Sequence, residues 1–244
     1  MKQGIFTIAE NSALTSNVFK MKLVGDVSDI TTSGQFINIK LDGLYLRRPI
    51  SVFDRESDSV TIIYKVVGHG TEQMSTMKVG EKLDVLTGLG NGYDTSKCEE
   101  HAVLLGGGVG VPPLYMLAKT LINEGKKVSV VLGFNTKDEV FCEEDFKALG
   151  ADVKVTTVDG SYGIKGFVTD ALPESYDHFF TCGPEPMLKA VYNATVTSGQ
   201  MSFEERMGCG FGACMGCSCK TLTGYKRICK DGPVMLKEEI LWED

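Results

Sequence analysis

The sequence predicts a multidomain α+β protein with three parts: an antiparallel β-barrel, an α/β domain with a mostly parallel sheet, and a small cysteine-rich domain. Three observations lead to this prediction. Short segments of alternating apolar and polar residues fill the first part, strand-like runs alternate with helix-like stretches in the second, and closely spaced cysteines occupy the third. The predicted domains cover residues 1–96, 97–200 and 201–244.

The composition is that of an ordinary globular protein. The 244 residues suffice for two compact domains and a small third one, and 43% of them are hydrophobic and 23% charged. The net charge of −7 and the scattered Lys and Arg residues argue against nucleic acid or an anionic membrane as a partner. No basic leader followed by an apolar core opens the chain, so we expect a cytoplasmic protein.

The first region is predicted to form strands. Period-two alternation occurs at 18–23, 35–41 and 60–67, and Gly, Ser and Asp separate these segments. Such patterning favours an antiparallel barrel or sandwich.

The second region has the pattern of βαβ units. Its predicted strands are 102–105, 128–132 and 178–182, and its predicted helices are 114–123, 143–149 and 185–197. Alternation of this kind implies a mostly parallel sheet with its ligand site at the carboxyl ends of the strands. The uncharged run 102–117 is interrupted by Gly and Pro, so we expect strand, turn and helix there and no membrane span.

The third region contains Cys209, Cys214, Cys217 and Cys229, in the order Cys-x4-Cys-x2-Cys followed by a more distant cysteine. This is the plant-type spacing for a 2Fe-2S cluster, and the glycines between the ligands let the backbone bend around it. The alternatives are structural zinc, which usually prefers paired Cys-x2-Cys knuckles, and a disulfide framework, which is typical of short secreted chains. Cys219 competes as a ligand, although the spacing favours the other four.

Three further segments have features of phosphate-binding loops. Gly108, Gly110 and Pro113 lie between a predicted strand and helix, where a pyrophosphate can approach the helix N-terminus, or where the chain makes a tight structural turn. Segment 47–51 combines two arginines and a serine with a proline, and such a set can bind a phosphate. The alternative interpretation is an exposed basic pair at the end of a strand. Segment 68–71 either supplies backbone N–H groups to a second phosphate or forms a hairpin turn.

Together these motifs resemble the ferredoxin-NADP reductase superfamily over essentially the whole chain. Arg48-Pro49-Ile50-Ser51 resembles its Arg-x-Tyr-Ser flavin motif, with Ile50 in place of the aromatic residue. Segment 108–113 resembles its Gly-x-Gly-x-x-Pro nucleotide loop, and Cys182-Gly183-Pro184 resembles its Cys-Gly-Pro motif. Within this superfamily, segments 47–51, 207–210 and 229–234 are similar to the family of electron-transfer subunits of NAD-dependent dihydroorotate dehydrogenase B.

The resemblance implies FAD in the barrel, NAD(H) in the central domain and a 2Fe-2S cluster on the four cysteines. The residues expected at FAD are Arg48, Pro49, Ile50, Ser51, Ile63, Tyr64, Lys65, Gly70 and Thr71. Since Ile50 removes a stacking surface, we expect Tyr64 or a neighbour to supply one. The nicotinamide nucleotide is expected at Gly108, Gly110 and Pro113. Cys182 is expected near the reacting carbon, and its alternative role is simple packing.

The nucleotide is expected to be NAD(H), because segment 135–139 offers one cation and two carboxylates where a 2′-phosphate would want Arg. By the same resemblance the chain is an NAD(H)-oxidoreductase subunit that receives electrons from an FMN-containing dihydroorotate dehydrogenase catalytic subunit, in a heterotetramer of two plus two. It would serve pyrimidine (UMP) biosynthesis. The alternatives are the small FAD/2Fe-2S subunit of an NADH-dependent ferredoxin:NADP oxidoreductase or sulfhydrogenase, and a non-enzymatic zinc-binding module.

Overall fold

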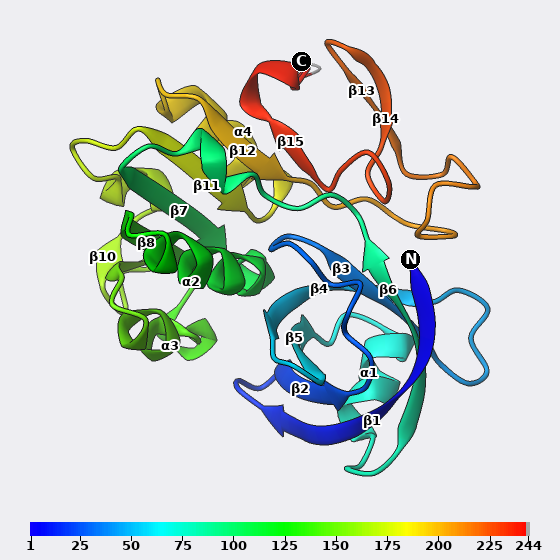
Figure 1. Cartoon of the computed structure of the whole chain (residues 1–244). Coiled ribbons are helices and arrows are strands. Elements are labelled where there is room, and N and C mark those ends of the chain that lie inside the picture. The colour runs from blue at the N-terminus through cyan, green and yellow to red at the C-terminus, as the bar shows by residue number, and fades with distance from the viewer. Residues whose placement is uncertain (243–244) are drawn as a thin grey trace.

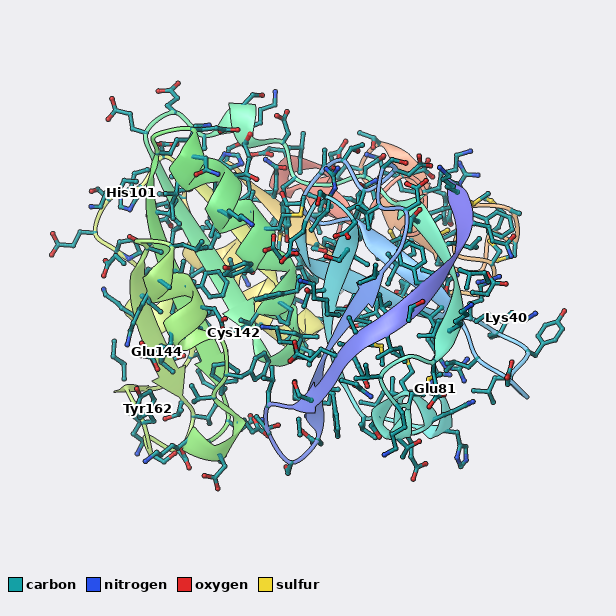
Figure 2. The ribbon with its side chains drawn as sticks, turned by 60° about the horizontal axis from the view of Figure 1, so that its bottom comes forward. Lys40, Glu81, His101, Cys142, Glu144 and Tyr162 are labelled. Atoms are coloured by element: carbon teal, nitrogen blue, oxygen red, sulfur yellow. The ribbon has the colours of Figure 1, made fainter. Side chains whose placement is uncertain are left out.

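A barrel and a twisted sheet lie side by side, and the C-terminal segment returns past both, in the computed structural model (Figure 1). The structure describes residues 1–242, so the last two residues of the predicted third domain lie outside the described residues. In Figure 2, Lys40 marks the barrel, whereas His101 and Tyr162 mark the far side of the central domain.

The N-terminal part is a closed antiparallel barrel with strand order β1-β2-β5-β4-β3-β6. Its elements are β1 (Lys2–Ala13), β2 (Val18–Val24), β3 (Phe36–Lys40), β4 (Arg48–Arg55), β5 (Ser59–Lys65), α1 (His69–Thr76) and β6 (Lys82–Leu89). Closure gives every strand two hydrogen-bonded neighbours, which removes the unpaired edges of an open sheet. Side chains alternate along β3, where Ile37 and Ile39 fill the barrel core and Phe36 faces the C-terminal segment.

The central part is a seven-stranded sheet with order β10-β9-β8-β7-β11-β12-β15. Its strands are β7 (His101–Gly107), β8 (Lys127–Phe134), β9 (Asp152–Thr157), β10 (Ile164–Lys165), β11 (His178–Cys182), β12 (Gly199–Ser202) and β15 (Val234–Leu236). The helices of this part are α2 (Tyr115–Asn123), α3 (Glu143–Ala148) and α4 (Glu185–Ala194). All neighbouring strands are parallel except β12 and β15.

The predicted fold class is confirmed, and the predicted elements match within a few residues at most ends. Helix α4 ends at Ala194, earlier than expected, because three β-branched residues follow it and favour extended backbone. Strand β12 crosses residue 200, and β15 from the C-terminal segment joins the central sheet. The hairpin of β13 (Ser218–Thr221) and β14 (Gly224–Arg227) lies outside both larger sheets. The domain boundaries themselves stay a prediction.

The barrel and the central domain are joined through β4 and α2. Phe53 on β4 stacks on Tyr115 of α2 with ring centroids 4.2 Å apart, and Lys119 forms an ion pair of 3.0 Å with Asp54. Because β4 also contains segment 48–51, these contacts fix the expected flavin strand relative to the nucleotide domain. Among residues 1–242, no helix is both long and apolar enough to cross a membrane.

Candidate cofactor sites

The glycine loop and Cys182 meet at the carboxyl edge of the central sheet. Strands β7 and β11 are parallel neighbours, with Gly106 opposite Cys182. The loop then turns through Gly108, whose φ is +52°, and Gly110 passes so close to β11 that an added Cβ would lie 2.3 Å from the Cys182 carbonyl oxygen. Pro113 is buried in the short 3-10 turn before α2. The structure thus brings Gly108, Gly110 and Cys182 together at this edge. Pro113, the fourth residue expected at the nucleotide, is buried in the turn that follows the glycines.

Cys182 is a partly exposed, neutral thiol. Burial raises its pKa to about 12, and a hydrogen bond with Ser202 offsets only part of that effect. Behind it, the Tyr93 hydroxyl donates a hydrogen bond of 3.1 Å to the Thr181 carbonyl oxygen, which ties the linker after β6 to β11. A thiol with this pKa is protonated at neutral pH, so Cys182 is suited to contact a ligand and not to act as a nucleophile.

A cleft separates the barrel from this carboxyl edge. From the barrel it is lined by Thr15, Asn17, Val18 and Lys65, and from the central domain by Gly108, Val109, Phe134, Glu139 and Phe141. Lys65 and Gly108, expected at FAD and NAD(H) respectively, therefore line one cleft. Glu139 is held in place, because its carboxylate accepts hydrogen bonds from the Asn135 backbone N–H at 3.1 Å and side-chain amide at 2.9 Å.

The expected FAD residues lie on β4, β5 and the start of α1. Arg48 folds against Gly70, where a Cβ would lie 2.1 Å from the Arg48 Nε. A side chain at position 70 would displace the guanidinium, so glycine lets the Arg48 side chain lie at the N-terminus of a helix, which itself attracts anions. Thr71 Oγ accepts hydrogen bonds from the backbone N–H groups of Val67 and Gly68. Segment 68–71 therefore begins a helix, and the hairpin turn that we considered for it is not formed.

The side chain of Tyr64 does not provide the expected stacking surface. It is 2% exposed, packs in the barrel core and donates a hydrogen bond of 3.1 Å to Asn11 Oδ1. Burial raises the pKa of Tyr64 above its usual range. Because side chains alternate along β5, Ile63 and Lys65 face outward and Tyr64 faces inward, which leaves only its backbone available to a ligand.

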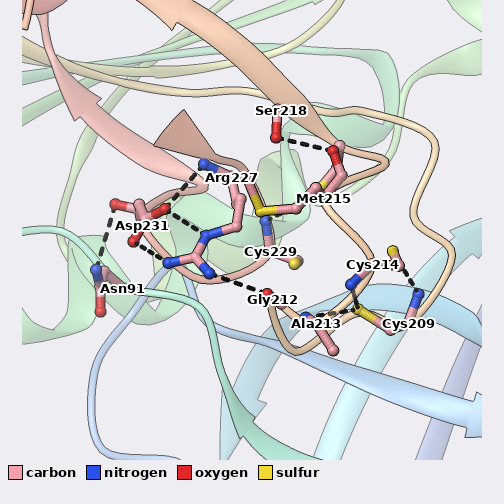
Figure 3. A network of polar contacts seen from close by, with 11 residues as sticks. Asn91, Cys209, Gly212, Ala213, Cys214, Met215, Ser218, Arg227, Cys229 and Asp231 are labelled. Atoms are coloured by element: carbon pink, nitrogen blue, oxygen red, sulfur yellow. Dashed lines mark hydrogen bonds and ion pairs between the residues drawn. The ribbon is translucent and has the colours of Figure 1, made fainter. Parts of the chain in front are cut away.

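Backbone N–H groups point at sulfur in the cysteine loop (Figure 3). Cys209 Sγ accepts hydrogen bonds from Ala213 at 3.2 Å and Cys214 at 3.4 Å, and Cys214 Sγ accepts one from Cys209 at 3.4 Å. Desolvation raises the pKa of Cys209, but these N–H groups outweigh it and lower the pKa to about 6. Gly212, with a φ of +89°, allows the bend that aims them.

The other two expected ligands form a second, buried pair. Cys229 donates its backbone N–H to Cys217 Sγ at 3.4 Å, and burial together with the neighbouring thiol raises the pKa of Cys229 to about 12. Across residues 1–242, no three His, Cys, Asp or Glu side chains converge as a preformed metal site. Cys219 lies on β13 and packs against apolar side chains. All eight cysteines are described and free, so the disulfide framework is not formed.

An ion pair that sequence reasoning missed holds the two ligand segments together. Arg227 binds Asp231 through Nε at 2.9 Å, and its Nη1 donates a hydrogen bond of 2.9 Å to the Gly212 carbonyl oxygen (Figure 3). Asn91 extends the network from the linker before β7 to the Asp231 carbonyl oxygen. The only signal in the sequence was a pair of opposite charges flanking Cys229.

The arrangement fits the expected cofactors. Four thiols with N–H donors aimed at sulfur suit a negatively charged iron-sulfur cluster better than a zinc site, and glycines allow the close bends around them. The Arg48 guanidinium beside the start of α1 suits a phosphate, and the glycine loop between β7 and α2 suits a nucleotide.

Comparison with known proteins agrees with this geometry. The model of the iron-sulfur cluster binding domain of dihydroorotate dehydrogenase B matches residues 204–241, and the oxidoreductase NAD-binding domain matches residues 104–193. The electron transfer subunit of dihydroorotate dehydrogenase B (NAD(+)) from Fusobacterium nucleatum is 47% identical, with 98% of this chain and 99% of that protein covered. The Bacillus pumilus subunit is 46% identical, with 98% of each chain covered.

The chain belongs to the family of dihydroorotate dehydrogenase B electron transfer subunits. Among solved structures, that of an NADH-dependent reduced ferredoxin-NADP oxidoreductase is similar over 98% of this chain and 90% of the other, with a TM-score of 0.90 and 31% identity. As a member of the family, the chain is an oxidoreductase subunit with FAD, a 2Fe-2S cluster and NAD(H) as cofactors, and it works with a catalytic subunit. The zinc-module alternative is therefore not supported.

Proposed function

We propose that this chain carries electrons from the FMN of a dihydroorotate-oxidising partner subunit, through its cluster and FAD, to NAD+ in UMP biosynthesis. The main support is that the expected sites adjoin one another: Lys65 and Gly108 line one cleft, and Asn38 on β3 contacts the Cys209 carbonyl oxygen. Bound FAD would exchange two electrons with nicotinamide and single electrons with the cluster. No side chain has to act as an acid or base.

We assign the cofactor residues as follows. Arg48 and the start of α1 with Gly70 and Thr71 bind the FAD pyrophosphate through charge-assisted and backbone hydrogen bonds. The remaining FAD contacts are Pro49, Ile50, Ser51, Ile63, Lys65 and the backbone of Tyr64. Cys209, Cys214, Cys217 and Cys229 ligate the cluster, and Cys219 does not.

The nucleotide residues are Gly108, Gly110 and Pro113, with Cys182 against the nicotinamide as a neutral thiol. Glycine at 110 lets the loop pack directly on β11, where a side chain would collide with the Cys182 backbone, and this keeps the loop beside Cys182. Glu139, fixed by Asn135, places a carboxylate beside the same cleft. A negative charge there disfavours a 2′-phosphate, so NAD(H) is preferred over NADP(H).

The assembly we propose is a heterotetramer of two electron transfer and two catalytic subunits, located in the cytoplasm, where a reducing environment suits thiolate ligands. The division into domains 1–96, 97–200 and 201–244 gives each cofactor its own region. Strand β15 then anchors the cluster region to the nucleotide domain.

Tagged purification from the native cell, followed by reconstitution, tests the proposal. We expect an FMN-containing subunit to co-purify and the complex to reduce NAD+ with dihydroorotate as the donor. The proposal fails if no dihydroorotate-oxidising subunit restores that reaction. Co-purification of a ferredoxin-dependent or NADP(H)-dependent subunit instead would favour the alternative function, that of the small FAD/2Fe-2S subunit of a ferredoxin:NADP oxidoreductase. The similar solved structure is of that kind of enzyme.

A further inference from the structure

The cleft between the barrel and the central domain has one wall from each of them. Val18 of the barrel lines it together with Phe134 and Phe141 of the central domain, and these three side chains belong to one hydrophobic core cluster. That packing fixes the two walls relative to each other. Asn17 lines the cleft from the barrel, and Glu139 lines it from the central domain. The cleft measures about 250 Å³, so it suits one sugar or base and not a whole dinucleotide.

The central-domain wall presents a hydrogen-bond acceptor. The two hydrogen bonds that hold Glu139 both come from Asn135, and both end on the same carboxylate oxygen, Oε2, at 3.1 and 2.9 Å. Within residues 1–242 the other oxygen, Oε1, has no hydrogen-bond or ion-pair partner, although Lys65 lines the same cleft. A carboxylate accepts hydrogen bonds and donates none, so a ligand at this wall must bring donors.

The barrel wall presents a donor, the side-chain amide of Asn17. The turn between β1 and β2 is fixed at this residue, because the Asn17 carbonyl oxygen accepts a hydrogen bond of 2.8 Å from the Val66 backbone N–H. The Thr15 hydroxyl accepts a hydrogen bond of 3.2 Å from the Val18 backbone N–H and donates to Asn17 Oδ1 at 3.4 Å. Asn17 Nδ2 is left without an acceptor among the described residues, on a side chain that lines the cleft.

A ribose diol fits an acceptor on one wall and a donor on the other. Its hydroxyl groups can donate to Glu139 Oε1 and accept from Asn17 Nδ2, whereas a phosphate carries the same charge as the carboxylate and is repelled by it. Gly108 of the nucleotide loop lines the same cleft. The nicotinamide is placed at Cys182 on β11, and β8, which leads to Glu139, lies on the other side of β7. The ribose at this cleft is therefore that of the adenosine half.

We propose that Asn17 is a specificity-determining residue for the nucleotide: its amide donates a hydrogen bond to a hydroxyl group of the adenosine ribose, and Glu139 accepts one from the same diol. NAD(H) is then held from both domains, and the barrel contributes to its affinity in addition to binding FAD. This inference rests on the proposed placement of NAD(H) at Gly108. It adds a binding residue from outside the nucleotide-binding domain.

The test uses the full chain with FAD and its cluster in place. The dependence of the rate of FAD reduction on NADH concentration gives the Kd for NADH and the limiting rate. Asn17→Leu, which is similar in size and has no polar group, should raise this Kd roughly three- to tenfold, as expected for one lost neutral hydrogen bond, and leave the limiting rate unchanged. Asn17→Asp should raise the Kd further, because a second carboxylate would then face Glu139.

Inhibitors show which part of the nucleotide Asn17 contacts. ADP should compete with NADH, and 2′-deoxy-ADP or 3′-deoxy-ADP, whichever lacks the contacted hydroxyl group, should bind the unaltered chain more weakly than ADP does. That difference should shrink in Asn17→Leu, because the amide has already been removed. Nicotinamide mononucleotide should inhibit both chains equally. Ser16→Ala is the matched control, since Ser16 is exposed in the same turn, and it should leave every one of these constants unchanged.

The outcomes separate this inference from the proposed function. If NADH does not reduce the FAD of the unaltered chain, the proposed function itself fails. If NADH does reduce it, and Asn17→Leu, or Asn17→Ala where the leucine variant does not fold, keeps the Kd for NADH, the inference alone is wrong. A raised Kd with an unchanged preference for ADP over its deoxy analogues would also overturn the inference, because Asn17 would then act on a part of the nucleotide other than the ribose. None of these measurements needs dihydroorotate or the partner subunit.

Discussion

The nucleotide edge and the cysteine loop are built in different ways. At the edge, Gly110 and Cys182 are held by regular parallel strands, and the backbones touch with no space for a side chain. In the cysteine loop, the bend at Gly212 is held by N–H groups on sulfur and by Arg227, which also pairs with Asp231. The nucleotide edge is therefore already formed without its ligand. In the cysteine loop the four sulfurs lie in two separate pairs and, within residues 1–242, do not yet form a metal site.

This difference suggests how each site should respond to change. A preformed site made of backbone is sensitive to volume, since nothing around it can move cheaply. A loop organised around its ligands is sensitive to the loss of a ligand, and its ligation contributes to its order. The following predictions test that contrast, from the largest expected effect to the smallest.

Cys229→Ser should lose nearly all cluster iron and still retain FAD. The substitution removes the buried and most distant of the four proposed ligands, and a serine hydroxyl is a weak ligand at neutral pH. Iron content, visible absorbance and EPR measure the cluster, and flavin released by denaturation measures FAD.

Cys219→Ser is the matched control, since this cysteine lies two positions from a ligand but packs against apolar side chains. It should keep both cofactors. Loss of iron in this variant would show that Cys219 is a ligand and that our assignment of four is wrong.

Gly110→Ala should lower kcat/KM for NADH by about 100-fold while the cluster and FAD remain, because the loop or β11 must shift by an ångström or so. The rate of NADH oxidation with ferricyanide as the electron acceptor gives this kcat/KM. Gly125→Ala is the control: its φ is +80° but nothing lies within 4 Å, so it should cost about 1 kcal/mol of stability and leave NADH oxidation intact. Equal NADH oxidation by Gly110→Ala and Gly125→Ala would contradict the prediction that the nucleotide edge is sensitive to added volume.

Much of this architecture could be predicted from the sequence, because the signals were local. Period-two segments and the alternation of strands with helices gave the barrel and the sheet, and cysteine spacing gave the ligand set that we propose. The inward direction of Tyr64 follows from the alternation at 60–67, because Tyr64 shares a strand face with Val60 and Ile62. The stacking role expected for it came from the resemblance and did not take that alternation into account. Asn38 was missed because its partner, Cys209, is 171 positions away.

Arg227→Ala should make cluster loss about fivefold faster and leave NADH oxidation through FAD unchanged. The substitution removes a solvent-exposed ion pair and the tether to the Gly212 carbonyl oxygen, so we expect only a modest effect. Bleaching of cluster absorbance in the presence of a chelator gives the rate. Arg227→Lys should be intermediate, because an ammonium cannot bind Asp231 and Gly212 as a fork. A bleaching rate equal to that of the unaltered chain would mean that ligation alone orders the loop.

The smallest expected effect lies away from both sites, at His178. Burial lowers the pKa of His178, and its Nε2 lies 3.1 Å from the Gln200 amide nitrogen, which suits a neutral imidazole accepting a hydrogen bond. The unfolded chain therefore binds a proton that the folded chain does not, so the free energy of unfolding should fall as pH drops below about 6.5, by at most about 1.4 kcal/mol per pH unit.

Denaturant unfolding at pH 7.5, 6.5 and 5.5 measures that slope. His178→Gln should flatten it, and a smaller slope should remain, because burial also lowers the pKa of His101. His69→Gln, at a side chain that is 95% exposed, should leave the slope as it is. An identical slope in the His178 variant would contradict this origin of the acid sensitivity. His178 lies at the start of β11 and Cys182 at its end, so protonation of His178 takes place away from the nucleotide edge. The free energy of unfolding should therefore change with pH, whereas NADH oxidation by the folded chain should not.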